Sequence, residues 1–287
     1  PICTTLAEAD QVLAKAEEQG VEVAVYHQGR TGGALSAVKA AIAAGKIGTL
    51  RYLQGSGKGY YGGYGLMNIA THMLNSMLAV AGPVRSVQAA ALTDGRPIAP
   101  ADVVPSPSGM GYIAGEQVTA ALDFASGITA SLLQHRFAKM DSTAYMMEIY
   151  GSEGRLYWKS GNPWFLPEPH FAPGKSEWQP LEPIVPDHFD AEGAASVEDY
   201  QFADEYVQAL DEGRAHECSG AEGRHVLEIL MGIFESGAYG RRVELPQTDR
   251  THPLLRWRRE AGLDLPAPMP RPYGEWLEVE DRRLGRS

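Results

Sequence analysis

The sequence predicts a mixed α/β and α+β fold: a short α/β opening followed by a large, open, mostly antiparallel β-sheet with helices on one face. Three observations predict it. A helix, a short apolar run and a second helix open the chain over residues 1–45. Strand-like segments then follow one another between residues 84 and 158, and capped helices come after residue 196. Runs of strands after an α/β opening are typical of an antiparallel sheet with helices on one side.

The first 45 residues carry the signals of two helices around one strand. Thr5 and Glu8 form a capping box, and the apolar residues that follow recur at helical spacing until Gly20. The apolar run 21–26 predicts a buried strand, and a second helix is expected from about residue 34 to 44. We therefore expect an α/β unit at this end of the chain.

A loop rich in Gly and Tyr follows the strand that we predict for residues 48–60. It reads Lys58-Gly-Tyr-Tyr-Gly-Gly-Tyr-Gly65. Glycines would let such a loop fold over a ligand, and tyrosines offer flat apolar faces with a polar tip. The alternative is an ordinary surface turn. The position of the loop directly before the polar helix around residue 72 favours a role in binding.

Strand signals dominate after Pro83. Apolar and polar residues alternate in the segment 118–124, and Ser126-Gly127 forms a turn into the next strand, which is a hairpin signal. A second hairpin is expected around the turn at residues 151–154. The predicted strands are 84–92, 118–124, 128–133, 145–150 and 155–158.

The segment 160–190 combines many prolines with aromatic residues, which is typical of ordered irregular chain or of a loose hairpin rather than of disorder. Ser196 caps a helix that is expected to end near Gly213. Ser219 and Glu222 form a second capping box, which opens a helix that ends before residue 240.

The end of the chain is predicted to be less regular. A short final strand is expected at residues 243–246. From residue 248 the sequence is rich in Arg and Pro, and we expect it to wrap over the surface or onto a partner subunit.

Composition argues against several classes of protein. The net charge of −11 disfavours nucleic acid as a partner, because phosphate binding needs clustered Lys and Arg. No run approaches the roughly 18 apolar residues of a membrane span. Cys3 and Cys218 frame no disulfide scaffold, which fits a reducing compartment, and His216 beside Cys218 is interpreted as part of a loop. No metal site is predicted, since no cluster has zinc or calcium ligand spacing. We expect a cytoplasmic protein, although an export signal before residue 1 would alter this.

Asn68, His72 and Asn75 are the strongest candidates for chemistry. Their spacing of i, i+4 and i+7 places two amides and one imidazole on the same helix face, beside an apolar stripe that would be buried. Such a face suits the wall of a cleft that binds a hydroxylated small molecule. The alternative is a buried hydrogen-bond network with no ligand.

Several segments occur in an order that is known from one enzyme family. They are 1–10, Arg30 with 39–50, Asn68-x-x-x-His72, 219–236 and 243–246. Together they resemble the Gfo/Idh/MocA family of NAD(P)-dependent oxidoreductases, relatives of glucose–fructose oxidoreductase and inositol dehydrogenase. The resemblance covers nearly the whole chain, and its specificity lies in the order of the segments rather than in any one of them.

This resemblance implies a domain organisation. Residues 1–45 would be the end of a Rossmann-type dinucleotide-binding domain, 46–247 the sheet domain, and 248–287 a C-terminal tail. On the order of 100 residues of the family's first domain would precede Pro1, including the Gly-rich pyrophosphate loop and a lysine thought to assist proton transfer. The chain alone is therefore expected to be inactive.

The resemblance also implies a reaction and a set of site residues. The reaction would be hydride transfer between NAD or NADP and a carbinol of a sugar, sugar derivative or cyclitol. His72, with an ordinary pKa near ~6.5, would take the hydroxyl proton. Asn68, the second catalytic candidate, would orient the substrate hydroxyl. The substrate residues would be Lys58, Tyr61, Tyr64, Asn75 and Arg136, and the nicotinamide would lie near Gln28 and Arg30.

Some of these assignments have alternatives. Arg30 could instead make a surface ion pair, and Arg136 a salt bridge on the sheet. His27, His188 and His225 are interpreted as structural. Asn68 and Asn75 stand where the family has acids, and an amide cannot accept a proton as a carboxylate does.

Two other functions fit the same resemblance. One is NAD-assisted glycoside cleavage, which would need acid or base groups beside His72. The other is a non-catalytic sugar-binding or scaffold protein, which the replacement of acids by amides favours. For each of them we expect a sugar or polyol as the partner, and a homo-oligomer formed through the apolar outer face of the sheet.

Overall fold

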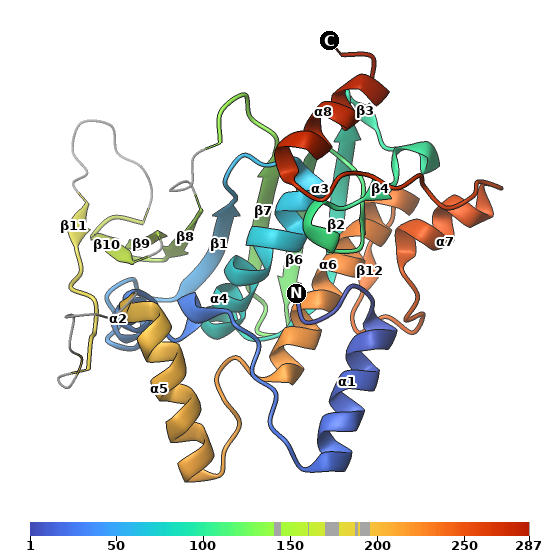
Figure 1. The fold of residues 1–287 in the computed structure, drawn as a ribbon. Coiled ribbons are helices and arrows are strands. Elements are labelled where there is room, and N and C mark those ends of the chain that lie inside the picture. The colour runs from blue at the N-terminus through green and yellow to red at the C-terminus, as the bar shows by residue number, and fades with distance from the viewer. Residues whose placement is uncertain (141–144, 160, 170–177, 187–188, 190–195, 287) are drawn as a thin grey trace.

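The computed structural model describes residues 1–286 except 141–144, 160, 170–177, 187–188 and 190–195. Its centre is a ten-stranded sheet with the strand order β11-β10-β9-β8-β1-β7-β6-β2-β12, and β3 lies beside β2 (Figure 1). Only β1 and β7 pair in parallel; the other pairs are antiparallel. The predicted open, mostly antiparallel sheet is therefore confirmed. The strands are β1 Leu50–Ser56, β2 Val84–Thr93, β3 Arg96–Pro97, β6 Gln117–Phe124, β7 Thr129–His135, β8 Met146–Gly151, β9 Arg155–Lys159, β10 Asn162–Leu166, β11 Gln179–Pro180 and β12 Val243–Glu244.

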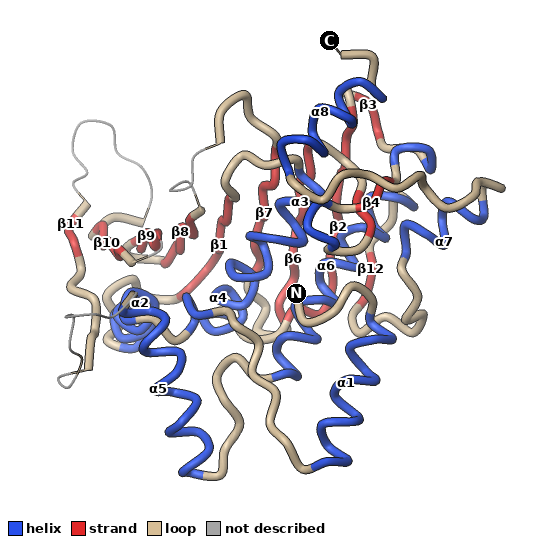
Figure 2. The backbone as a smooth tube through the Cα atoms, viewed as in Figure 1, coloured by secondary structure: helices blue, strands red, loops and turns tan. Residues whose placement is uncertain are grey.

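Helices cover one face of the sheet, as Figure 2 shows. Along β6, residues 118, 120, 122 and 124 are buried and the residues between them are more exposed, so only one face enters the core. A small second sheet pairs β4 Val104–Pro105 with β5 Tyr112–Ile113. The α-helices are α1 Leu6–Gln19, α2 Gly33–Ala43, α3 Gly62–Gly65, α4 Thr71–Ala81, α5 Val197–Glu212, α6 Gly220–Tyr239, α7 Pro253–Glu260 and α8 Tyr273–Arg283.

The predicted helix starts are confirmed. Thr5 and Glu8 make the capping box of α1, and the hydroxyls of Ser196 and Ser219 accept from backbone N–H groups in the first turns of α5 and α6. The three helices end at Gly20, Gly213 and Gly240, each with positive φ. These ends are local chemistry, which is why the sequence predicted them.

The strand predicted for residues 21–26 is wrong. This segment makes only an isolated bridge between Ala24 and Ser219, and Val21 and Tyr26 are exposed. A strand needs a neighbour to pair with, and within the described chain the segment has α6 and its cap beside it instead.

The expectation for the tail is also corrected. Residues 253–260 and 273–283 form α7 and α8, and Leu254 and Trp276 are fully buried. The end of the chain is therefore more regular than expected, and it contributes single side chains to the core.

Close approach between β1 and α4 brings the polar helix to the sheet. A Cβ added to Gly55 of β1 would lie 2.3 Å from the sulfur of Met73, so the Met73 side chain of α4 lies directly against this glycine. The end of β1 and the start of α4 thus sit close together, with the Gly/Tyr loop between them.

Candidate functional site

Asn68, His72 and Asn75 lie on a helix whose first part is irregular. Residues 66–70 form a π-helical segment, η2 Leu66–Ala70, and α4 starts at Thr71. The π segment changes the phase of the helix, so Asn68 does not keep the regular i, i+4 relation to His72 that the sequence suggested. Such π segments occur often at functional sites.

His72 is largely buried, and its surroundings favour the neutral imidazole. Burial first, and then nearby positive charge that includes Lys58, lowers its pKa from 6.5 to about 4. The ordinary pKa expected from the sequence is therefore wrong. At neutral pH the ring carries no charge and has a lone pair that can accept a proton.

His27 lies beside His72. Their ring centroids are 5.1 Å apart at an interplanar angle of 72°. Burial, and then the charge of His72, holds the pKa of His27 well below its ordinary value. His27 precedes the short 3₁₀ helix η1 Gln28–Arg30, so η1 and α4 present their polar side chains to each other.

Asn75 is fully buried and is held by Arg30. Its Oδ1 accepts from Arg30 Nη1 at 3.2 Å, and the same Nη1 donates to Glu222 at 2.9 Å. Cys218 Sγ lies 3.9 Å from that Oδ1. Arg30 thus makes an ion pair with Glu222, as the alternative interpretation allowed, and that pair also fixes the orientation of Asn75.

Unpartnered buried polar atoms gather around η1 and α4. Within the described residues, His27 Nδ1, Gln28 Oε1, Arg30 Nε and Asn75 Nδ2 have no hydrogen-bond partner. Buried polar groups are normally hydrogen-bonded, so a group of orphaned donors and acceptors calls for an explanation such as a ligand or ordered water. The set contains donors and an acceptor, which suits the amide or hydroxyl groups of a small polar molecule.

The structure places the remaining predicted site residues in different surroundings. Lys58 is close enough to His72 to affect its pKa. Tyr61, by contrast, is fully buried, and its hydroxyl donates to Glu280 at 3.1 Å. Tyr64 is buried under Tyr273. These two tyrosines are core residues in this structure rather than the walls of an open pocket.

Arg136 lies at the end of β7, where two carboxylates bind it. Asp281 accepts from both of its terminal nitrogens at 2.6 and 2.8 Å, and Glu116 accepts at 3.1 Å. The salt-bridge alternative therefore describes Arg136, and its charge is already compensated within the chain.

Other candidates from the sequence have structural roles. His225 accepts from the backbone N–H of Val84 at 3.0 Å and contacts Glu228, as a structural residue would. Cys218 is buried, and burial raises its pKa to about 12, so it is a neutral thiol. His216 accepts from the backbone of Cys218. His188 lies outside the described residues.

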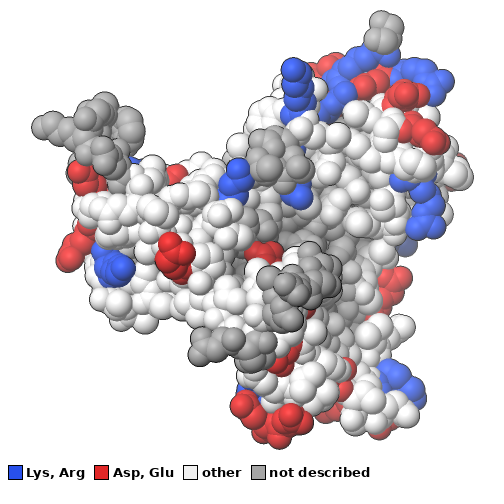
Figure 3. Space-filling view, turned by 60° about the vertical axis from the view of Figure 1, so that its left-hand side comes forward, with Lys and Arg blue, Asp and Glu red and all other residues white. Residues whose placement is uncertain are grey.

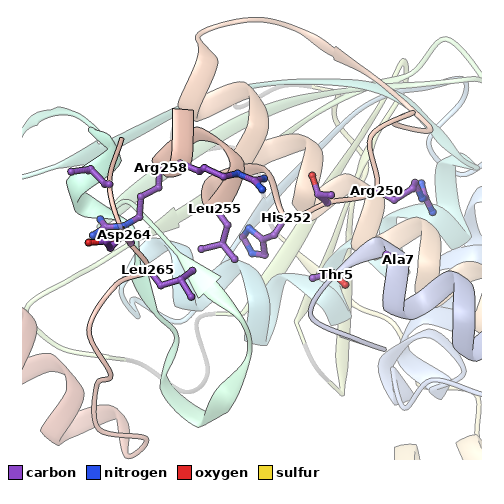
Figure 4. A pocket seen from close by; sticks show the side chains of 11 residues that line it. Thr5, Ala7, Arg250, His252, Leu255, Arg258, Asp264 and Leu265 are labelled. Atoms are coloured by element: carbon purple, nitrogen blue, oxygen red, sulfur yellow. Dashed lines mark hydrogen bonds between the residues drawn. The ribbon is translucent and has the colours of Figure 1, made fainter. Parts of the chain in front are cut away.

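A cavity of about 460 Å³ lies elsewhere, between the start of α1, α7 and the segment after α7 (Figure 4). Two of the three arginines that line it are bound by other groups of the chain. Arg250 pairs with Asp10 and Glu228, and Arg258 donates to backbone carbonyls, including that of Pro100. None of the predicted site residues lines it. Its polar groups serve the attachment of α7 to α1 and α6.

Three further features bear on possible partners: surface charge, groups of metal-ligating side chains and the apolar content of the helices. On the face in Figure 3, Lys and Arg are interspersed with Asp and Glu among uncharged residues. Within the described ranges no group of three or more His, Cys, Asp or Glu is arranged to hold a metal ion. Of the helices that the structure describes, none has both the length and the apolar composition for crossing a membrane.

His27 is the residue of this site that sequence reasoning missed. It was interpreted as structural, although it directly precedes Gln28 and Arg30. The signal that pointed to those two residues, a position at the end of the segment 21–26, applies equally to His27.

Comparison with known proteins finds one family model and several solved structures that are similar to this chain. The family model described as GFO/IDH/MocA C-terminal domain matches residues 35–157. No curated protein matches the sequence. Among solved structures, an NAD binding oxidoreductase from Klebsiella pneumoniae superimposes with a TM-score of 0.67 at 18% identity, over 86% of this chain and 72% of that one.

Two further solved structures are similar over the same share of this chain. Levoglucosan dehydrogenase in complex with NADH and levoglucosan has a TM-score of 0.66 and 20% identity, with 86% of this chain and 72% of that chain covered. A dehydrogenase from Bordetella pertussis in complex with NADH and UDP-GlcNAcA has a TM-score of 0.58 and 21% identity, with 86% and 70% covered. At these identities the likeness establishes the fold.

Proposed function

We propose that the chain is a nicotinamide-dependent oxidoreductase, since its residues 35–157 match the family model described as GFO/IDH/MocA C-terminal domain. Its substrate would be a sugar, a sugar derivative or a cyclitol with a free carbinol. The observation that carries this proposal is the group of orphaned polar atoms on η1 and α4 beside the neutral imidazole of His72. The similar structures, two of them solved with NADH and a sugar compound, support the same class of reaction.

The residues present fit the nicotinamide end of such a cofactor. A carboxamide needs one donor and one acceptor from the protein, and Gln28 Oε1 and Asn75 Nδ2 are an unpartnered acceptor and donor. When bound, NAD or NADP would supply the hydride acceptor. The phosphates would need a cradle of backbone N–H groups, and the described residues contain no Gly-rich loop opening a helix for that purpose. We therefore expect this chain alone to bind NADH weakly.

His72 would act on the substrate hydroxyl. As the carbinol carbon loses its hydride, the hydroxyl oxygen must lose a proton, and a neutral imidazole within hydrogen-bond reach can take it. Lys58 and burial both disfavour the imidazolium that results, which makes the ring a weaker base but favours passing the proton on. Asn68 and Asn75 would orient hydroxyl groups, since an amide can donate and accept but cannot take a proton.

The alternative of NAD-assisted glycoside cleavage needs a second acid or base beside His72. His27 lies at that position, but it is buried and its low pKa keeps it neutral and poorly able to donate a proton. The non-catalytic alternative is favoured by Asn68 and Asn75. An activity measurement separates it from the proposal.

The test is a substrate panel. The chain, expressed with and without any sequence that its gene encodes upstream of Pro1, is incubated with NAD⁺ or NADP⁺ and a set of sugars, sugar acids and cyclitols. We expect reduced nicotinamide to form with at least one compound in the upstream-extended form. Sugar binding by calorimetry without cofactor reduction would instead establish the non-catalytic alternative.

We also propose a homo-oligomer through the outer face of the sheet. Cross-strand pairing aligns Glu148, Tyr157 and Trp164 in a row on that face, and Tyr150 lies two residues along β8. Glu148, Tyr157, Trp164 and Trp178 line a hollow of about 320 Å³. A second copy could cover these aromatic side chains, which account for much of the energy of protein interfaces. Light scattering that shows a monomer at high concentration would contradict this.

A further inference from the structure

The C-terminal segment of residues 269–286, which we name the clamp, contacts the Gly/Tyr loop with aromatic side chains. The hydroxyl of Tyr273 accepts from the backbone N–H of Tyr61 at 2.9 Å. The Tyr273 ring stacks on Tyr64, with centroids 5.0 Å apart and 20° between planes, and meets the edge of Tyr60 at 5.1 Å. One side chain of the clamp therefore contacts all three tyrosines of the loop.

Buried groups on the next turns of α8 complete this contact. Trp276, fully buried, lies edge-on to Tyr61 at 4.9 Å and donates from Nε1 to the carbonyl of Pro105 at 2.7 Å. The carboxylate of Glu280 is also fully buried; it accepts from the Tyr61 hydroxyl and is paired with Arg283 at 2.7 Å. The polar groups of Tyr273, Trp276 and Glu280 thus have hydrogen-bond partners, which limits the cost of their desolvation.

Ion pairs attach the end of the clamp to the sheet. Asp281 holds Arg136 with two hydrogen bonds, and Arg286 pairs with Glu116 and with Asp94 at 2.9 Å. Arg136 follows β7, and Glu116 precedes β6. The clamp is thus anchored to the same strand ends against which the loop rests.

The loop itself is confined between the clamp and the sheet. The N–H groups of Gly62 and Gly63 donate to the carbonyls of Glu116 and Gly115, both at 2.9 Å. A Cβ on Gly62 would lie 2.5 Å from the carbonyl oxygen of Gln134, so the backbone is in close contact there. The loop cannot move away from the sheet without displacing Tyr273.

This confinement bears directly on the candidate site, because Lys58 begins the loop and the π segment with Asn68 follows it. We propose that the clamp is a positioning element for this site, with Tyr273 as the residue that fixes the loop so that Lys58 and the start of α4 keep their places beside His72. The catalytic consequence of this proposal rests on the proposed function. The positioning of the loop itself can be measured without any substrate.

The pKa of His72 reports this positioning. His27 packs against its ring, and the charge of Lys58 acts on it. In the native protein the pKa is lowered to about 4. Release of the loop would move Lys58 away and admit water, and both changes favour the imidazolium.

The experiment is an NMR titration of the full chain with isotope-labelled histidine, without substrate or cofactor. In Tyr273→Ala we expect the His72 midpoint to rise from about 4 toward its ordinary 6.5, so that it titrates above pH 5. Arg271→Gln is the matched control: Arg271 belongs to the clamp but binds Ser108, away from the loop, and should leave the midpoint unchanged. A folded Tyr273→Ala protein with a native His72 midpoint overturns the proposal.

Tyr273→Phe keeps the test decisive if the alanine variant does not fold. It retains the stack on Tyr64 and removes only the oxygen that accepts from Tyr61. We expect faster hydrogen exchange of the Tyr61 amide together with a smaller rise of the His72 midpoint. Native exchange and a native midpoint in this variant would overturn the proposal. Absence of enzymatic activity in all forms would count against the proposed function alone.

Discussion

Two regions of this molecule bury polar side chains against the same sheet, and the regions differ in whether these side chains have hydrogen-bond partners. Around α8, Glu280 is bound by Arg283 and Tyr61, and Asp281 by Arg136. Around η1 and α4, Gln28 Oε1 and Asn75 Nδ2 have no partner. The first region is complete as it stands, and the second is not.

The two regions are therefore expected to contribute differently to stability and to function. A buried polar group without a partner costs about 1–3 kcal/mol, so the η1/α4 cluster is a place where the fold gives up stability. In the clamp region the buried carboxylate of Glu280 is paired, and aromatic side chains pack against each other. We expect substitutions at α8 to change the free energy of unfolding and substitutions around His72 to change chemistry.

The largest expected effect is on turnover. In the active form and with a substrate from the panel, His72→Ala should lower kcat by about 10²–10⁴-fold, because a positioned base contributes that much. Cofactor affinity should remain nearly native. His135→Ala is the control: it also removes an imidazole, but one that lies on β7 and contacts Thr119. Native turnover in His72→Ala would exclude His72 as the base.

Substitutions in the clamp should change the free energy of unfolding. Trp276→Ala removes a fully buried indole and should lower the free energy of unfolding by about 3–5 kcal/mol, as large-to-small core substitutions do. Leu265→Ala, whose side chain is 69% exposed, should change it by less than about 0.5 kcal/mol. Urea denaturation measures both. Equal small effects would mean that the tail does not belong to the cooperative unit.

Stability should fall in mild acid. The pKa values of His72 and His252 are both lowered from 6.5 to about 4 in the folded protein, chiefly by burial. Between these two values the unfolded chain binds protons that the folded chain does not, so stability is fully present above the unfolded value and is lost as pH falls. At pH 5 each histidine should cost on the order of 2 kcal/mol.

His252→Leu tests this pH dependence. Unfolding free energies are compared at pH 7.5 and pH 5 in the native protein and in the variant. The variant should lose less stability on acidification, since one of the buried imidazoles is gone. An unchanged difference between the two pH values would show that His252 does not couple folding to protons.

The smallest effect concerns Asn68. A carboxylate near an imidazole favours the charged ring, so Asn68→Asp should raise the pKa of His72 by about one unit. Histidine NMR measures the shift, and Asn162→Asp on β10 controls for the added charge. A native His72 pKa in Asn68→Asp would show that Asn68 does not face the imidazole.

Much of the fold could be read from the chain because it depends on local rules. The alternation in residues 118–124 and the turn at Ser126-Gly127 predicted the β6–β7 hairpin that the structure contains. Ser196 and Ser219 marked the starts of α5 and α6, because a capping hydroxyl acts within one helical turn. The choice of Asn68, His72 and Asn75 rested on the same kind of local spacing.

Tertiary structure decided what these local signals could not. Segment 21–26 has the composition of a strand, but pairing requires a neighbouring strand, and the described chain gives it α6 instead. Tyr61 and Tyr64 have the composition of a binding loop, but Tyr273 and Glu280, more than 200 positions away, bury them. The low pKa of His72 likewise depends on burial and on the charge of Lys58. Composition specifies what a side chain can do, and burial by distant parts of the chain decides which of those options has the lowest free energy.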